Sequence, residues 1–257
     1  MVFKKFITAI VLLVAAVLLN ACASSKSVKE QLLKRPATLD YLIDGPATTF
    51  KTDLKIFIEE VEAPSNTATL NGSVEKGKGS FVPLIFYTKI SQDYIYQLDR
   101  KGILESPESF LREGFIREAQ RKCMYRISPD QSTADYTLKL DIDSASIVVL
   151  MNLTSESFSA PMPGYGAISV HKNKNGIKSG KAYSAIRYRL QDKNGKVITE
   201  GRLISELPVQ SSAEAGVYVP GLYTFSSVNA AAVAGLSDVL AKNFDELITI
   251  LNSSLTE

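Results

Sequence analysis

The chain has 257 residues, of which 29 are lysine or arginine and 27 are aspartate or glutamate, with two cysteines and one histidine. Two of the lysines lie in an N-terminal leader described below, so the rest of the chain is formally neutral. This balance gives no basis for binding nucleic acid, which needs a basic excess or a clustered basic face. One histidine and two cysteines are too few for the usual ligand set of catalytic zinc, and the length suits a single domain.

The N-terminus has the three parts of a secretory leader. Lys4 and Lys5 precede an apolar run over residues 6–19 that contains one polar residue, Thr8, and the small residue Ala21 stands directly before Cys22. The run has 14 residues, whereas a helix needs about 20 apolar residues to cross a bilayer. We therefore expect residues 1–21 to be a signal peptide, with an uncleaved membrane helix as the alternative.

The stretch Leu19-Asn20-Ala21-Cys22 resembles the lipobox of bacterial lipoproteins, whose cysteine receives a thioether-linked diacylglycerol before cleavage. This resemblance implies that Cys22 is the lipid attachment residue and that its acyl chains hold the mature protein on a bilayer. Ala23 and the absence of an acidic tract after Cys22 resemble lipoproteins that are sent to the outer membrane and face the periplasm.

The first part of the mature chain combines polar linkers with short apolar segments. Residues 22–36 are predicted to be the lipidated N-terminus and a tether with some helical tendency near 28–34, and residues 37–252 a single domain. The stretch 63–80, rich in Asn, Ser, Gly and Lys, is predicted to be a loop. Three strands are predicted around it, over 38–44, 53–61 and 81–90.

A helix is predicted to begin after Ser106, which is a favourable N-cap residue and is followed by Pro107 at the first helical position. Apolar residues then recur every four positions, at Leu111, Phe115, Ala119 and Cys123. Because Cys123 falls on this stripe, we expect a buried, inert thiol. A reactive or intermolecularly paired thiol is the alternative.

The clearest strand pattern covers residues 134–143, where apolar and polar residues alternate strictly. Residues 146–153 continue this strand after a bend. Several prolines and glycines follow, so residues 154–182 are predicted to be a long loop with a short strand near 167–170.

A β-hairpin is predicted next, with strands over 184–191 and 196–207 joined by an Asp-Lys-Asn-Gly turn. A second long loop is expected over 208–226, followed by a helix over about 227–251. The residues predicted to be buried on this helix are Val233, Leu236, Leu240, Phe244, Leu247 and Leu251.

The order of these elements is strands, helix, strands, hairpin and helix. This order predicts an α+β fold with a mixed or antiparallel sheet and two main helices packed on one face.

The sequence contains no arrangement of residues typical of a catalytic site. His171 has no evident serine or acid partner, and the Walker-like letters at 77–80 lack the first glycine of a phosphate-binding loop. Asp141 and Asp143 could hold calcium or act as acid and base, but the period of the strand alone explains them as its solvent side. We therefore predict a protein that is not an enzyme, with no metal and no cofactor.

Two predicted loops are unusually apolar, over residues 161–166 and 217–225. Aromatic residues in surface loops can anchor a protein partner or touch a membrane interface. The alternative is that these rings fold back onto the core. The candidate contact residues are Tyr165, Tyr218, Leu222, Tyr223 and Phe225.

Four segments together resemble the ABC-type transport auxiliary lipoproteins. Tyr41-Leu42-Ile43-Asp44 is similar to the opening strand of that family, and residues 110–138 are similar to its helix followed by an Ala-Asp-Tyr-x-Leu strand. Residues 188–195 resemble its late hairpin, and residues 232–251 its closing helix. Lipoproteins of the curli-secretion type and penicillin-binding-protein activators have a similar layout.

This resemblance implies a non-enzymatic accessory or binding subunit of an envelope transport complex, with a protein partner and no nucleic acid. One alternative is an assembly or secretion lipoprotein, in which residues 145–175 form a hairpin of an oligomeric membrane structure, so a homo-oligomer is possible. The others are an activator of a cell-wall enzyme and an envelope hydrolase that uses His171.

Overall fold

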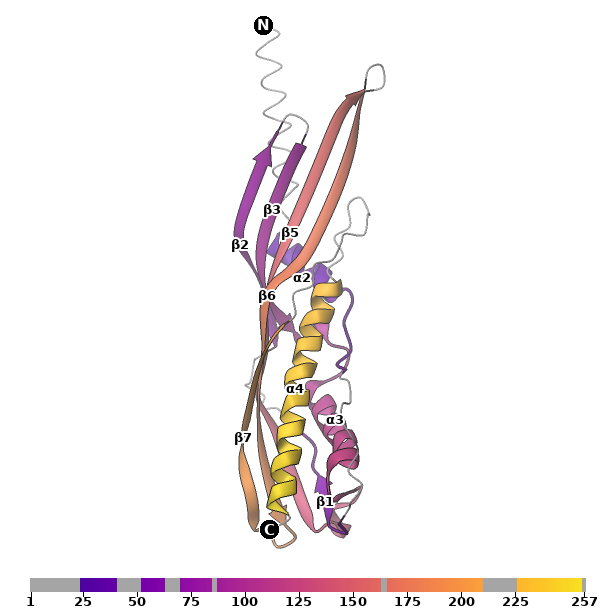
Figure 1. The fold of residues 1–257 in the computed structure, drawn as a ribbon, viewed down its shortest axis with the longest axis vertical. Coiled ribbons are helices and arrows are strands. Elements are labelled where there is room, and N and C mark those ends of the chain that lie inside the picture. Colours follow the sequence, from indigo (N-terminus) through magenta and orange to yellow (C-terminus); the bar gives the residue numbers. More distant parts are fainter. Residues whose placement is uncertain are drawn as a thin grey trace.

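The structure is a computed structural model and describes residues 24–40, 52–62, 70–84, 87–162, 166–209 and 226–255. Within these ranges the chain forms one seven-stranded sheet and three α-helices, which confirms the predicted α+β class. The molecule is elongated, and the sheet runs along most of its length (Figure 1). The helices α3 and α4 lie along only one half of the sheet, away from the outer ends of β2, β3, β5 and β6 (Figure 1).

The longest feature is the antiparallel pair of strands β5 (Tyr136–Met162) and β6 (Gly166–Asp192), each of 27 residues. They pair from Tyr136↔Asp192 to Met162↔Gly166, with register shifts at Ile142/Ser144 and Leu150/Met151. The predicted loop over 154–182 is therefore wrong apart from its short strand near 167–170, because its described residues form the outer half of the hairpin. Since neither face of this half carries a continuous apolar row, its residues lack the alternation that identifies a strand.

The strands β2 (Asn71–Pro83) and β3 (Tyr87–Asp99) form a second hairpin, which was not predicted from the sequence. The predicted loop over 63–80 is wrong from residue 71 onward, and residues 63–69 lie outside the described residues. The predicted strand over 81–90 is also wrong, because β2 ends and β3 begins within it. The side chains of β2 are mostly exposed. Because neither face of the strand is buried, its sequence lacks the apolar–polar alternation that predicts a strand.

The hairpin of β6 and β7 (Val197–Pro208) confirms its prediction. In the turn, the side chain of Asp192 accepts hydrogen bonds from the backbone N–H groups of Asn194 (2.8 Å) and Lys196 (2.9 Å). Gly195 has a φ of 79°, which lies in the left-handed region that favours glycine.

The short strands β1 (Lys55–Ile58) and β4 (Arg126–Ser128) make the sheet mixed, because β1 runs parallel to both β4 and β5. The strand predicted over 53–61 is thus confirmed at its centre. The strand predicted over 38–44 is not found in its described part, residues 38–40, and residues 41–44 lie outside the described residues. Two short 3-10 helices complete the fold, Arg100–Gly102 and Gln131–Thr133.

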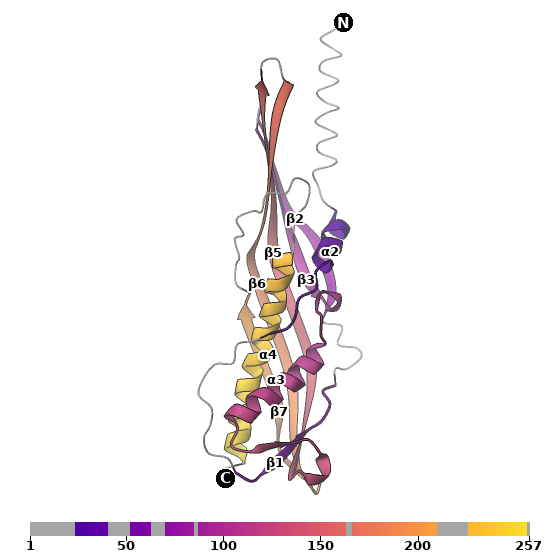
Figure 2. The ribbon, with the colours of Figure 1, turned by 90° about the vertical axis from the view of Figure 1, so that its right-hand side faces the viewer.

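The helices α3 (Pro107–Lys122) and α4 (Ser226–Ser254) confirm the two predicted helices. The side chain of Ser106 caps α3 by accepting a hydrogen bond from the N–H of Ser109. The α4 helix lies along β5, β6 and β7, whereas α3 packs against α4 and β4 (Figure 2). All of the apolar residues predicted to line these helices are buried, and so is Cys123.

The first helix, α2 (Ser25–Leu33), lies in the predicted tether over 22–36 and confirms the helical tendency predicted near 28–34, but it is docked rather than free. Val28 and Leu32 are fully buried, and the ammonium group of Lys29 contacts the carbonyl oxygen of Gly72 (2.7 Å) and the carboxylate of Asp99 (2.9 Å). Polar composition suggested a free linker, but two apolar residues four positions apart are enough to dock one face of a short helix.

We expect Leu32→Ala to lower the free energy of unfolding by about 2–5 kcal/mol, because it removes buried methyl groups and leaves a cavity under α2. Urea unfolding followed by circular dichroism measures this change. Glu30→Ala, at an exposed position of the same helix, is the control and should change little. Equal effects of the two substitutions would mean that α2 is not docked.

Candidate functional site

None of the residues singled out from the sequence as contact sites can be placed. Those outside the described residues are Cys22, Tyr165, Tyr218, Leu222, Tyr223 and Phe225. The backbone of His171 is described, and it pairs with Ser157 inside β6 rather than lying in a loop as predicted. Candidate sites therefore have to come from the surface of the sheet itself.

The sheet has one face covered by α4 and one face on which no described helix packs, which we call the open face. Strand residues alternate between the two, so that Leu203 and Ser205 of β7 are buried beneath α4 while Ile204 is 51% exposed. Val148 of β5 and Ile95 of β3 also lie on the open face, with 39% and 36% of their surface exposed. An uncovered face with large apolar side chains is a natural place for a partner to bind.

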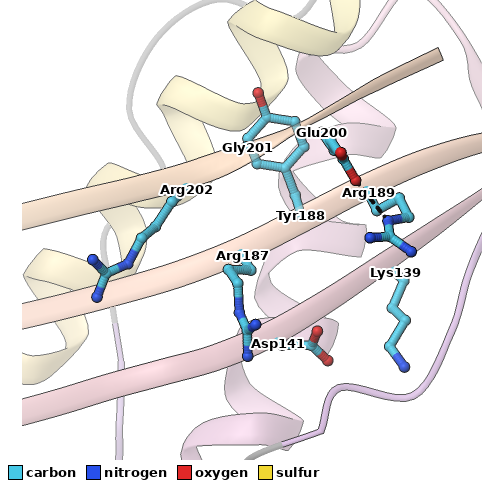
Figure 3. A pocket seen from close by; sticks show the side chains of 8 residues that line it. All are labelled: Lys139, Asp141, Arg187, Tyr188, Arg189, Glu200, Gly201 and Arg202. Carbon is cyan, nitrogen blue, oxygen red and sulfur yellow. Dashed lines mark hydrogen bonds and ion pairs between the residues drawn. The ribbon is translucent and has the colours of Figure 1, made fainter. Parts of the chain in front are cut away.

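The first hollow on the open face is strongly charged and has a volume of about 460 Å³ (Figure 3). We call it the charged hollow. Side chains from three neighbouring strands, β5, β6 and β7, line it. Its lining residues are Lys139, Asp141, Arg187, Tyr188, Arg189, Glu200, Gly201 and Arg202.

A single carboxylate beside the charged hollow holds two arginines. Asp143 lies at the register shift between Ile142 and Ser144, and its side chain is 19% exposed. One of its oxygens is 2.5 Å from Nε of Arg187 on β6, and the other is 2.9 Å from Nε of Arg202 on β7. This arrangement links three strands and fixes two guanidinium groups side by side.

The next row of the sheet carries further ion pairs. Nε of Arg189 is 2.8 Å from a carboxylate oxygen of Glu200 (Figure 3), and Nζ of Lys139 is 3.7 Å from that of Glu62. Oδ1 of Asp141 is buried and has no hydrogen-bond partner in the structure. The described residues contain no group of three or more His, Cys, Asp or Glu side chains that could hold a metal ion.

Gly201 has a steric role in this region. It pairs directly with Tyr188 across the β6–β7 ladder, and a Cβ atom at position 201 would come within 2.8 Å of the phenol oxygen. The glycine therefore lets the tyrosine ring lie flat over β7, which explains a glycine in the middle of a strand.

The second hollow, which we call the apolar hollow, has a volume of about 560 Å³. Ile95, Val148 and Leu150 form much of its lining, and Leu207 and Pro208 close it on the β7 side. An ion pair stands at its rim, where Nζ of Lys181 is 2.8 Å from Glu206, and this hydrogen bond raises the pKa of the lysine.

A polar network adjoins the apolar hollow on the same face. The carboxylate of Asp93 accepts hydrogen bonds from Lys178 (2.7 Å) and Asn152 (2.6 Å). Burial alone would raise the pKa of Asp93, but these hydrogen bonds and the positive charge of Lys178 outweigh burial and hold the pKa below its usual range. The group therefore stays ionised at neutral pH.

Sequence reasoning missed both hollows. Apolar and polar residues alternate over 184–191, and Arg187 and Arg189, which lie on the polar side of this alternation, are exposed. The alternation could not identify Asp143 as their neighbour, because a register shift in β5 decides which side chains meet across the ladder. Asp141 and Asp143 do lie on the outer side of their strand, as the period predicted.

Comparison with known proteins does not assign a family: no family model matches the chain, and no curated protein does. A Xanthomonas campestris crystal structure described with the family model DUF330 is 10% identical, with a TM-score of 0.47 over 86% of this chain and 95% of that one. A Helicobacter pylori crystal structure, described as a homologue of a neuraminyllactose-binding hemagglutinin, is 11% identical, with a TM-score of 0.27 over 83% and 98%. Identities and TM-scores this low leave the resemblance to the transport auxiliary lipoproteins untested.

Among the described residues, no helix combines the length and the apolar character needed to cross a membrane.

We expect Asp143→Asn to lower the free energy of unfolding by about 1 kcal/mol, because it leaves two adjacent guanidinium groups without their shared counter-charge. Urea unfolding at low and high salt measures this loss, which should shrink at high salt as the charges are screened. Glu200→Gln, which removes the partner of one exposed arginine, is the control and should cost less. A loss that is equal for both variants would contradict the bridging role of Asp143.

Proposed function

We propose that this protein is a lipid-anchored envelope lipoprotein that acts as a non-enzymatic accessory subunit of a transport complex and binds a protein partner through the open face of its sheet. The observation that carries the proposal is the open face itself, along which lie a charged hollow and an apolar hollow. The anchor rests on the lipobox resemblance at Cys22, and the transport complex on the resemblance to the auxiliary lipoproteins.

The two hollows together have the composition of a protein–protein interface. Such interfaces combine an apolar centre with a polar rim, and arginine is enriched in them. Here Val148 and Leu150 supply apolar surface, and Ile204 of β7 adds more between them and the two arginines. Arg187 and Arg202 pair across the β6–β7 ladder, and Arg202 is two residues from Ile204. Because Asp143 already holds both guanidinium groups, a partner would meet arginines of defined position rather than mobile ones.

A binding role is also favoured by how the polar groups of the charged hollow are used. Arg189 and Glu200 pair with each other, as do Asp143 and the two arginines beside it. Nucleophilic catalysis of the Ser–His or Cys–His type needs a serine or cysteine hydrogen-bonded to a histidine, and the lining of this hollow contains no serine, cysteine or histidine.

An assembly or secretion component remains the second candidate, because the described residues within 145–175 belong to the paired strands β5 and β6. A strand inserted in lipid needs one consistently apolar face. In the outer half of this hairpin, Glu156 pairs with Lys172 on one face, and Ser155 lies on the other. This polarity favours the accessory role, and a ring-shaped oligomer after detergent extraction would reverse the ranking.

We expect Val148→Asp to abolish most of the co-purification of a partner from solubilised membranes, because it places a charge in the apolar hollow. Val197→Asp is a matched control, since Val197 is 40% exposed against 39% for Val148 but lies beside the β6–β7 turn. Quantitative mass spectrometry of the cross-linked pull-down measures the loss. Equal recovery of the partner with both variants, or no specific partner with the unchanged protein, would contradict the proposal.

We expect the natural protein to begin at Cys22 and to carry acyl chains on that residue. Mass spectrometry of the N-terminal peptide measures this directly, and Cys22→Ser should remove the added lipid mass. An intact and unacylated leader in the purified natural protein would rule out the anchor while leaving the open face as a binding site.

A further inference from the structure

The far end of the sheet is a separate surface with its own chemistry. We call the four-stranded outer part, made of β2, β3 and residues 148–162 and 166–181 of β5 and β6, the blade (Figure 1). Strands β2 and β5 end, and β3 and β6 begin, at the same end of the blade, remote from α3 and α4 (Figures 1 and 2).

Exposed apolar side chains gather at this end. Eleven large hydrophobic residues among the described ones are exposed, and five of them lie within about five residues of where β2 and β5 end or β6 begins. The five are Phe81 (38%), Val82 (42%), Leu84 (62%), Phe158 (50%) and Val170 (43%).

The register places part of this set in one row across three strands. Tyr87 of β3 pairs with Phe158 of β5, which pairs with Val170 of β6, so their side chains lie on the same face. Beyond this row, β5 and β6 continue for four residues each, to Met162 and from Gly166. An aromatic and aliphatic row therefore stands just behind the projecting end of the longer hairpin.

Positive charge follows directly behind the apolar row. Two residues back on the same face are Lys89, Glu156 and Lys172, and one further row back Thr154 pairs with Lys174. Glu156 is within 3.4 Å of Lys89, whereas Lys172 and Lys174 are exposed and form no ion pair with any described residue. Successive side chains on one face of a strand are about 7 Å apart, so these lysines lie within about 15 Å of the apolar row.

We propose that the apolar end of the blade docks on a lipid bilayer that contains anionic lipids. Aromatic and aliphatic side chains at the end would enter the interface, and Lys172 and Lys174 would then lie at the level of the headgroup phosphates. Apolar burial combined with attraction between lysines and anionic lipids is the general basis of interfacial membrane binding. This contact is additional to the anchor of the proposed function and does not depend on it.

The absence of tryptophan from the chain makes a direct test possible, since a single introduced tryptophan reports its own surroundings. The full-length protein carrying Phe158→Trp is reconstituted into vesicles whose acyl chains are brominated and whose lipids are about one third phosphatidylglycerol. In a second arm, bare brominated vesicles of the same composition are added to protein in unbrominated vesicles. We expect fluorescence quenching of roughly twofold or more in at least one arm, because bromine quenches only a ring that enters the bilayer.

Val197→Trp is the control, because Val197 is also exposed but lies at the opposite end of β6 and β7. It should not be quenched in either arm. Adding Lys172→Glu and Lys174→Glu to Phe158→Trp should remove most of the quenching, and so should replacing phosphatidylglycerol with phosphatidylcholine.

Unquenched Phe158→Trp in both arms, while flotation shows the protein on its vesicles, would overturn the proposal and leave the anchor intact. A blue shift that depends on protein concentration and needs no lipid would also overturn it, because the occupant would then be a second copy of the chain.

Discussion

The pairing of β5 with β6 is the constraint on which the rest of the structure depends. Each strand has 27 residues, and the hairpin spans both halves of the molecule (Figure 1). In the inner half it supports β1 and β7 and receives α4, and in the outer half it supports β3 and through it β2. A β-hairpin of this length is stable only where other strands or a helix cover it, so each half depends on its own neighbours.

The two halves solve this problem with different chemistry. Under α4, a buried network fixes the helix over the sheet: Asn243 donates to Ser184 (2.7 Å) and accepts from Ser205 (2.6 Å). At the base of the blade, Tyr96 donates to Asn229 of α4 (2.8 Å), and burial raises the pKa of this tyrosine so that its hydroxyl remains protonated. Buried polar side chains without hydrogen-bond partners are costly, so these hydrogen bonds hold α4 on one face of the sheet. The other face is left without a described helix.

The same contrast explains what could be predicted from the sequence. The two long helices and the β6–β7 hairpin were predictable because Leu111, Phe244 and Leu190 belong to apolar rows that burial imposes. The blade was not predictable, because its strands carry polar residues such as Ser155 and Lys172 on both faces. Its strands are held by backbone hydrogen bonds, which do not produce a pattern of apolar residues in the sequence. The charged hollow was partly predictable, since the period identified outward-facing residues but not the register shift that joins them.

The docking of α2 bears on how the molecule stands at a membrane. Three residue steps separate Cys22 from the first residue of α2, a distance of at most about 11 Å. If Cys22 carries acyl chains, the anchored end of the chain leads almost at once into a helix fixed to the sheet by Val28, Leu32 and the ion pair of Lys29 with Asp99. A flexible tether would let the open face point anywhere. A docked helix instead sets the orientation of the open face relative to the bilayer, and a partner held in the same membrane would then meet that face without a search over all orientations.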